Sequence, residues 1–119
     1  MKVKGIRWIG TRTDKFDEMV KFYKDTLGLV QSYSEEGFAA FDMPNGDRVE
    51  VFAPDYPDHA HFTTGPVGGF EVEDIENARL EMEEKGIEFL GPTAGNKSRW
   101  AHFRAPDGNV YELTQPAKK

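Results

Sequence analysis

The chain repeats a stretch of its own sequence. Residues 38–54, FAAFDMPNGDRVEVFAP, align with residues 100–116, WAHFRAPDGNVYELTQP, at a constant offset of 62 positions. The two stretches share Ala, Phe, Pro, Gly, Glu and the closing Pro. Each has two runs of strand-forming residues joined by a Pro-Asn-Gly or Pro-Asp-Gly turn, which is typical of a β-hairpin. The repeat therefore predicts two copies of one hairpin, with Glu50 and Glu112 at the same place in each.

The first hairpin follows a predicted strand and helix. Residues 6–13 have the composition of a strand, and Asp14 after them is a residue type that commonly caps a helix N-terminus. Apolar side chains then recur at helical spacing until Gly28, a residue type that commonly ends helices. A short strand is predicted at residues 29–34. The first half is thus predicted to be a βαβββ unit.

The second hairpin follows the same elements. A strand is predicted at residues 68–73, and Asp74 is the expected helix cap. An apolar stripe at helical spacing runs to Gly86, and a short strand is predicted at residues 87–90. The order of elements and their spacing match those of the first half. The predicted fold class is therefore α+β, built from two tandem βαβββ modules.

The two modules are expected to form one domain. Module one spans about residues 1–54 and module two about residues 67–119, with a proline-containing linker at about residues 55–66. Neither half is long enough to bury a sizeable core alone, so we expect residues 1–119 to fold together.

Composition excludes several classes of function. The net charge of −6 argues against a nucleic-acid partner, because such partners demand basic surfaces. The absence of cysteine excludes disulfides, thiolate metal sites and cysteine nucleophiles. No apolar run approaches the length of a membrane span, and the N-terminal residues lack the apolar stretch of a signal peptide. We therefore expect a cytoplasmic protein with no membrane partner.

Two segments resemble a known superfamily. Residues 103–113, FRAPDGNVYEL, and residues 22–29, FYKDTLGL, are similar to sequences of the vicinal oxygen chelate superfamily. That superfamily includes glyoxalase I, bleomycin-resistance proteins, fosfomycin-resistance enzymes and extradiol dioxygenases. The resemblance implies curved mixed sheets with helices on the convex side and a cleft for a small-molecule ligand on the concave side. It also implies a homodimer, which is usual for members of this size.

The resemblance also implies where a metal would bind. Metal-dependent members take ligands from four equivalent strand positions, usually two His and two Glu. The equivalent positions here are Arg7, Glu50, Val67 and Glu112. A catalytic ion generally needs about three protein ligands, and Arg and Val cannot provide them. We therefore favour no cofactor and predict that Arg7 neutralises a glutamate; if a divalent metal binds, Glu50 and Glu112 are its expected ligands.

Strand alternation, taken with the cross-strand pairing that the resemblance implies, then predicts the cleft side of each strand. Arg7, Ile9 and Thr11 are expected to face the cleft, and Trp8 the helix side. The predicted ligand-cleft residues are Arg7, Phe38, Glu50, Trp100, His102 and Glu112. His102 is the candidate general acid–base, with Glu112 to orient it. Alternatively, His102 simply packs while hydrogen-bonding a neighbouring carboxylate.

Three functions remain open on the sequence. The favoured one is a metal-independent small-molecule binder with an aromatic and charged cleft, like the bleomycin-resistance proteins. The second is an enzyme of this superfamily, such as a glyoxalase-type lyase or isomerase, with an altered metal site. The third is a dimeric module whose cleft is vestigial.

Overall fold

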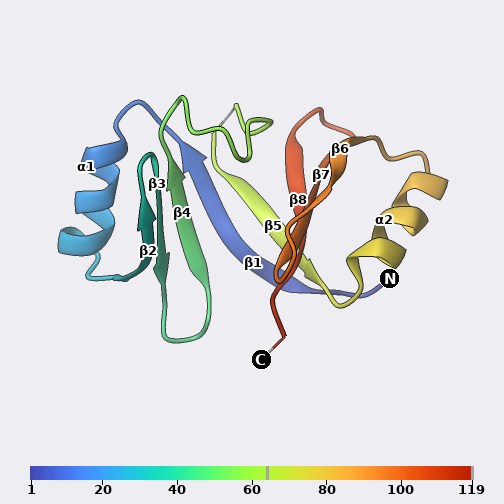
Figure 1. Cartoon of the computed structure of the whole chain (residues 1–119), viewed down its shortest axis with the longest axis horizontal. Helices are drawn as coiled ribbons and strands as arrows, with labels where there is room; N and C mark the ends of the chain where they lie inside the picture. Colours follow the sequence, from blue (N-terminus) through green and yellow to red (C-terminus); the bar gives the residue numbers. More distant parts are fainter. Residues whose placement is uncertain (64, 119) are drawn as a thin grey trace. The chain divides into compact units, whose positions relative to one another are not determined.

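The computed structural model describes residues 1–63 and 65–118 and confirms an α+β fold (Figure 1). The predicted βαβββ order occurs twice along the chain. The elements are β1 (Val3–Arg12), α1 (Phe16–Lys21), η1, a π-helix (Phe22–Thr26), β2 (Val30–Glu35), β3 (Phe38–Asp42), β4 (Arg48–Phe52), β5 (Val67–Val72), α2 (Ile75–Glu84), β6 (Phe89–Ala94), β7 (Arg99–Arg104) and β8 (Val110–Gln115).

The chain divides into two compact units, each described here by itself. The first unit is Trp8–Val67, and the second unit combines Met1–Arg7 with Gly68–Lys119. In the first unit the strands lie in the order β2-β3-β4-β1, with β1 parallel to β4 and the other pairs antiparallel. In the second unit the equivalent strands lie in the order β6-β7-β8-β5, again with one parallel pair, β5 and β8.

In each unit one face of the sheet packs against a helix, as Figure 1 shows for α1 and α2. Alternate residues of a strand point to opposite faces, so each hairpin contributes half of its side chains to this core. In the first unit the core is Ala39, Phe41 and Val51 with Phe16, Met19, Val20, Tyr23, Leu29 and Val49. In the second unit it is Val72, Ile75, Ala78, Ala101, Phe103 and Leu113 with Phe70, Met82, Ile87, Phe89 and Tyr111.

The predicted helix ends are mostly confirmed. Asp74 caps α2, because its Oδ1 accepts a hydrogen bond from the Asn77 amide at 3.2 Å. Gly28 and Gly86 follow the two helical segments with φ values of +67° and +88°, the left-handed conformation that glycine adopts readily.

The predicted cap of the first helix is wrong. Lys15, not Asp14, holds the N-cap position of α1, and it makes no side-chain capping bond. The hydroxyl of Thr13 accepts a hydrogen bond from the Lys15 amide at 3.0 Å. This local turn competes with capping by Asp14, and the helix starts one residue later than an aspartate cap would require.

Strand boundaries differ from the prediction by a few residues. β1 starts at Val3, before the predicted residue 6, and β6 covers Phe89–Ala94 rather than residues 87–90. Ile87 lies in the turn that ends α2, because its amide donates to the Met82 carbonyl at 3.0 Å. In the described part of the chain no helix has the length and apolar character needed to cross a membrane.

Candidate functional site

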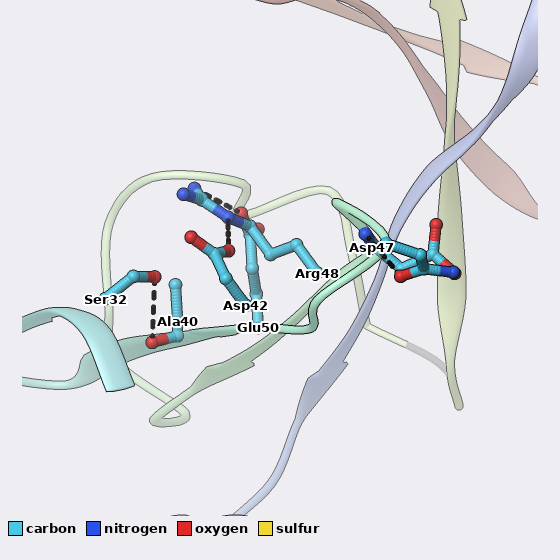
Figure 2. Close-up of polar contacts among 7 residues, drawn as sticks. Ser32, Ala40, Asp42, Asp47, Arg48 and Glu50 are labelled. Carbon is cyan, nitrogen blue, oxygen red and sulfur yellow. Dashed lines mark hydrogen bonds and ion pairs between the residues drawn. The ribbon is translucent and has the colours of Figure 1, made fainter. Parts of the chain in front are cut away.

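Glu50 lies in β4 on the face turned away from α1. Its register partners are Gly10 of β1 and Ala40 of β3, and the residue is 7% exposed. A guanidinium lies beside it, with Arg48 Nη1 3.7 Å from Glu50 Oε2. The same arginine donates from Nε to Asp42 Oδ1 at 2.9 Å, so it bridges two carboxylates on one sheet face (Figure 2).

The surroundings of Arg48 stabilise its positive charge. Burial alone would lower its pKa, but the hydrogen bond to Asp42 and the charges of Asp42 and Glu50 together raise the pKa above the usual arginine value. Glu50 therefore has a permanent cation in its own hairpin. We expected an arginine to neutralise a glutamate, but from position 7. Alternation along β4 places Arg48 on the Glu50 face, so the sequence contained a signal for it.

Glu112 is paired with a histidine. His102 of β7 is its register partner, and His102 Nε2 lies 3.0 Å from Glu112 Oε1. The two residues are 6% and 2% exposed, so the pair is buried. Trp100 has the same strand parity and shares their face, which is turned away from α2. The predicted contact between His102 and Glu112 is thus present, and the role of the pair stays a prediction.

The register of β1 corrects the predicted side-chain directions. Gly10 pairs with Glu50, so Trp8, Gly10 and Arg12 share the Glu50 face. The hydroxyl of Thr11 hydrogen-bonds Tyr23 on the helix side. The prediction that Ile9 and Thr11 face the cleft is therefore wrong, because they lie on the face opposite Glu50. The prediction that Trp8 faces the helix is also wrong, because Trp8 lies on the Glu50 face. A shift of one residue in the assumed register reverses every side chain of a strand.

The Glu50 face also carries aromatic side chains. Phe38, predicted to be a wall of the ligand cleft, is stacked on Tyr56 with ring centroids 5.3 Å apart and planes inclined by 16°. The Tyr56 hydroxyl donates to Glu35. Burial and this contact with Glu35 raise the pKa of Tyr56 above its ordinary value. A ligand that stacks on the same side of Phe38 would have to displace Tyr56.

The four superfamily positions do not fit a divalent ion. Glu50 lies beside a guanidinium, which competes with a metal for the carboxylate, and Arg7 and Val67 offer no ligating atom. His102 and Glu112 are a different pair of donors, an imidazole nitrogen beside a carboxylate oxygen. Arg7 lies in β1, half-buried, and its predicted role in ligand binding stays a prediction.

Comparison with known proteins identifies the family. Residues 5–113 match the model of the Glyoxalase/Bleomycin resistance protein/Dioxygenase superfamily. The uncharacterized protein YraH of Bacillus subtilis (strain 168) is 31% identical over 129 residues, covering 95% of this chain and 97% of YraH.

Solved structures share the fold. Methylmalonyl-CoA epimerase from Mycobacterium tuberculosis superposes with a TM-score of 0.74 and 21% identity, covering 98% of this chain and 90% of the epimerase. A glyoxalase/bleomycin resistance protein/dioxygenase superfamily member from Vibrio splendidus 12B01 superposes with a TM-score of 0.69 and 18% identity. The match covers 93% of this chain and 99% of the Vibrio protein. The family match over residues 5–113, the YraH similarity and the repeated βαβββ fold together show that the chain belongs to the glyoxalase/bleomycin resistance protein/dioxygenase superfamily.

Proposed function

We propose that the protein binds a small organic molecule, without a metal ion, on the sheet face that carries Trp100, His102 and Glu112. The observation that carries this proposal is the buried His102–Glu112 pair, with 3.0 Å between Nε2 and Oε1. The imidazole and the carboxylate offer a hydrogen-bond donor and an acceptor, and the half-buried Trp100 offers a flat apolar wall.

The repeat supports a role beyond folding for this pair. The first unit has Ala40 at the position equivalent to His102, and that strand pairs with its neighbour in the same register. An imidazole is therefore not needed at this position to build the hairpin. Burying a carboxylate is unfavourable unless it is hydrogen-bonded. Apolar side chains of similar volume would fill the same space with at least equal stability, so packing alone does not explain the pair.

The charge of the protein favours a ligand that is neutral or cationic. The chain carries a net charge of −6, which attracts cations over distances of about a Debye length, roughly 8 Å at physiological ionic strength. The proposed ligand class is therefore a planar organic molecule with a hydrogen-bonding group and no strong negative charge.

Metal analysis combined with ligand screening tests this proposal. Purified protein is expected to contain no stoichiometric divalent metal. A thermal-shift screen uses planar and cationic antibiotics, bleomycin included, and at least one should stabilise the protein; a ligand at 100 times its Kd contributes about 2.7 kcal/mol. The stabilisation should be lost in Trp100→Ala and His102→Gln. The matched control is His61→Gln, which makes the same chemical change at an exposed residue of the linker.

Two results would contradict the binder. One is stoichiometric metal that is lost in Glu112→Gln. The other is a flat response across the whole screen, which would favour the vestigial module.

A second candidate, a proton-transferring enzyme, is favoured by the orientation of His102. When Nε2–H donates to Glu112, the basic lone pair is on Nδ1, and a carboxylate that fixes an imidazole in this way is a common arrangement for a general base. Methylmalonyl-CoA, the substrate named for the Mycobacterium tuberculosis structure, is a suitable probe. In D₂O the enzyme should catalyse replacement of the α-proton of methylmalonyl-CoA by deuterium, and His102→Gln should slow this exchange about 10²-fold or more. Exchange no faster than in buffer rules out this activity on this substrate.

We also propose that the protein is a homodimer, as the resemblance to small superfamily members implies. Light scattering coupled to gel filtration should give twice the monomer mass. A mass equal to one chain across the accessible concentration range would contradict the dimer.

A further inference from the structure

The side chain of Arg12 gathers the segment that follows β4. We call residues 53–62 the strap. Its carbonyl groups converge on the guanidinium, which donates to each of six of them. Arg12 Nε donates to Phe62 O at 2.9 Å, Nη1 to Ala53 O at 2.8 Å, Tyr56 O at 3.0 Å and Pro54 O at 3.4 Å, and Nη2 to Asp58 O at 3.1 Å and His59 O at 2.8 Å.

This set of acceptors suits a guanidinium and no other side chain. Arginine presents five N–H donors in one plane, whereas lysine presents three donors around a single nitrogen. Burial lowers the pKa of Arg12 and the charge of Asp55 opposes this, but an arginine stays protonated in proteins. The carbonyls therefore always face a cation at the centre of the strap.

The strap has little regular structure of its own. It contains turns but neither helix nor strand in its described residues. Its amides at Ala53, Tyr56 and Phe62 donate to Gly37 O, Ala53 O and His59 O, at 2.8, 3.2 and 3.0 Å. Two of these bonds close short turns within the strap. Local turns do not hold a ten-residue segment in place, so the shape of the strap depends on what lies beneath it.

The rings of the strap lie on the aromatic face of the first unit. Phe62, 1% exposed, packs on Trp8 at 5.7 Å between centroids. The Tyr56 ring stacks on Phe38 at 5.3 Å, and the His59 ring stacks on Phe52 at 5.3 Å. The strap thus covers the rings that the sheet presents on the Glu50 side.

His59 has a backbone conformation that requires support. Its φ is +59°, a left-handed conformation that is unusual for a residue with a side chain. Arg12 hydrogen-bonds the carbonyl of His59 at 2.8 Å and that of the preceding Asp58 at 3.1 Å. The guanidinium therefore holds the peptide groups on both sides of the His59 α-carbon, and with them the direction of the imidazole.

We infer that Arg12 is a positioning residue that templates the strap: its guanidinium organises the carbonyls, directs the His59 ring onto Phe52, and closes the aromatic face to ligands. Removing the guanidinium should open the strap and expose Trp8, Phe38 and Phe52. Arg12 and the strap both belong to the first unit.

Chymotrypsin digestion of Arg12→Ala and Arg12→Lys tests the inference. Chymotrypsin cleaves after aromatic residues that are not followed by proline, so its target in the strap is Phe62, and the Tyr56–Pro57 bond is resistant. Mass spectrometry should find cleavage after Phe62 about ten-fold faster in both variants than in the parent protein, because the local opening equilibrium has shifted. Binding of the dye ANS should rise as the aromatic face is exposed. The control is Arg104→Ala, which removes an arginine that donates to one hairpin carbonyl, Gly108 O at 2.9 Å, in the second unit.

Chemical rescue separates templating from a general loss of stability. Methylguanidinium, at concentrations far below denaturing ones, should restore protection and the His59 ring resonances in Arg12→Ala, whereas equimolar methylammonium should not. Cleavage at the parent rate with unchanged His59 resonances would overturn the inference. If Arg12→Ala fails to fold, recovery of its circular dichroism by methylguanidinium alone supports the inference. Failure of both cations to restore either the fold or the protection overturns it.

Discussion

Glu50 and Glu112 occupy equivalent positions of the repeat, yet each contacts a basic group from a different strand. Glu50 has Arg48 in its own strand, where the second unit has Val110. Glu112 has His102 in the adjacent strand, where the first unit has Ala40. Arginine is a permanent charge, whereas histidine gains and loses a proton near neutrality. The same carboxylate position therefore has an arginine beside it in one unit and a histidine in the other.

Replacing Arg48 tests how Glu50 is kept in its buried position. Arg48→Met removes the charge while keeping the apolar stem, and it should lower the free energy of unfolding by about 1 kcal/mol in urea titrations. The estimate is modest because Arg48 and Asp42 are partly exposed. Adding Glu50→Gln should recover part of the loss, since the two residues interact. Strict additivity in this double-mutant cycle would contradict a direct interaction between Arg48 and Glu50.

We predict that ionisation of Tyr56 destabilises the folded protein at alkaline pH. Its pKa is raised in the folded protein by burial and by Glu35, so the neutral phenol is favoured by folding. This contribution is fully present below the ordinary tyrosine pKa of about 10 and is lost as pH rises through the higher folded value. The free energy of unfolding should therefore fall above about pH 10, and less so in Tyr56→Phe. Tyr33→Phe, at an exposed tyrosine, should change the profile less; an unchanged profile in Tyr56→Phe would contradict the prediction.

At the scale of elements, the close packing around β1 depends on a glycine. A Cβ at Gly10 would lie 2.6 Å from a ring atom of Trp8 and 2.9 Å from one of Phe52. Gly10→Ala should therefore destabilise the protein by about 1–3 kcal/mol in urea unfolding. Gly65→Ala is the matched control, because a Cβ there meets no described residue within 4 Å apart from its neighbours in the chain, and its effect should stay within about 0.5 kcal/mol. Equal effects of the two substitutions would contradict the tight packing over β1.

The elements that the sequence predicts correctly are those with a local signal. The Pro-Asn-Gly and Pro-Asp-Gly turns, the cap at Asp74 and the helix-ending Gly28 and Gly86 each depend on a few neighbouring residues, and all are confirmed. The side-chain directions of β1 depend on its pairing with β4, which is distant along the chain. No local pattern sets that register, and the prediction was wrong by one residue.

In the candidate site, too, the features with a local sequence signal were predictable and the others were not. The contact of His102 with Glu112 was predictable, because antiparallel strands joined by a short turn pair residues that lie equally far from the turn. The part played by Arg12 was not, since its acceptors are main-chain carbonyls, which every residue carries. A sequence pattern cannot show which carbonyls converge. The strap therefore could be recognised only in the structure.

At the scale of the whole molecule, we propose that the two modules unfold as one domain. Each module has about half of the chain, and folded segments this short bury so little apolar surface that they are only marginally stable alone. The chain offers a direct test, because it contains two tryptophans, Trp8 in the first unit and Trp100 in the second. In Trp100→Phe the remaining fluorescence reports on the first unit, and in Trp8→Phe it reports on the second.

For each variant, urea unfolding followed by tryptophan fluorescence should coincide with unfolding followed by far-ultraviolet circular dichroism, which averages over both units. The two signals should share one midpoint, and the slope should be about 1–3 kcal/mol per molar urea, as for a small domain that unfolds completely. Trp8 is buried, so Trp8→Phe should lower the midpoint of both signals together. A fluorescence transition that precedes the dichroism transition in either variant would show that one unit unfolds first, and would contradict a single cooperative domain.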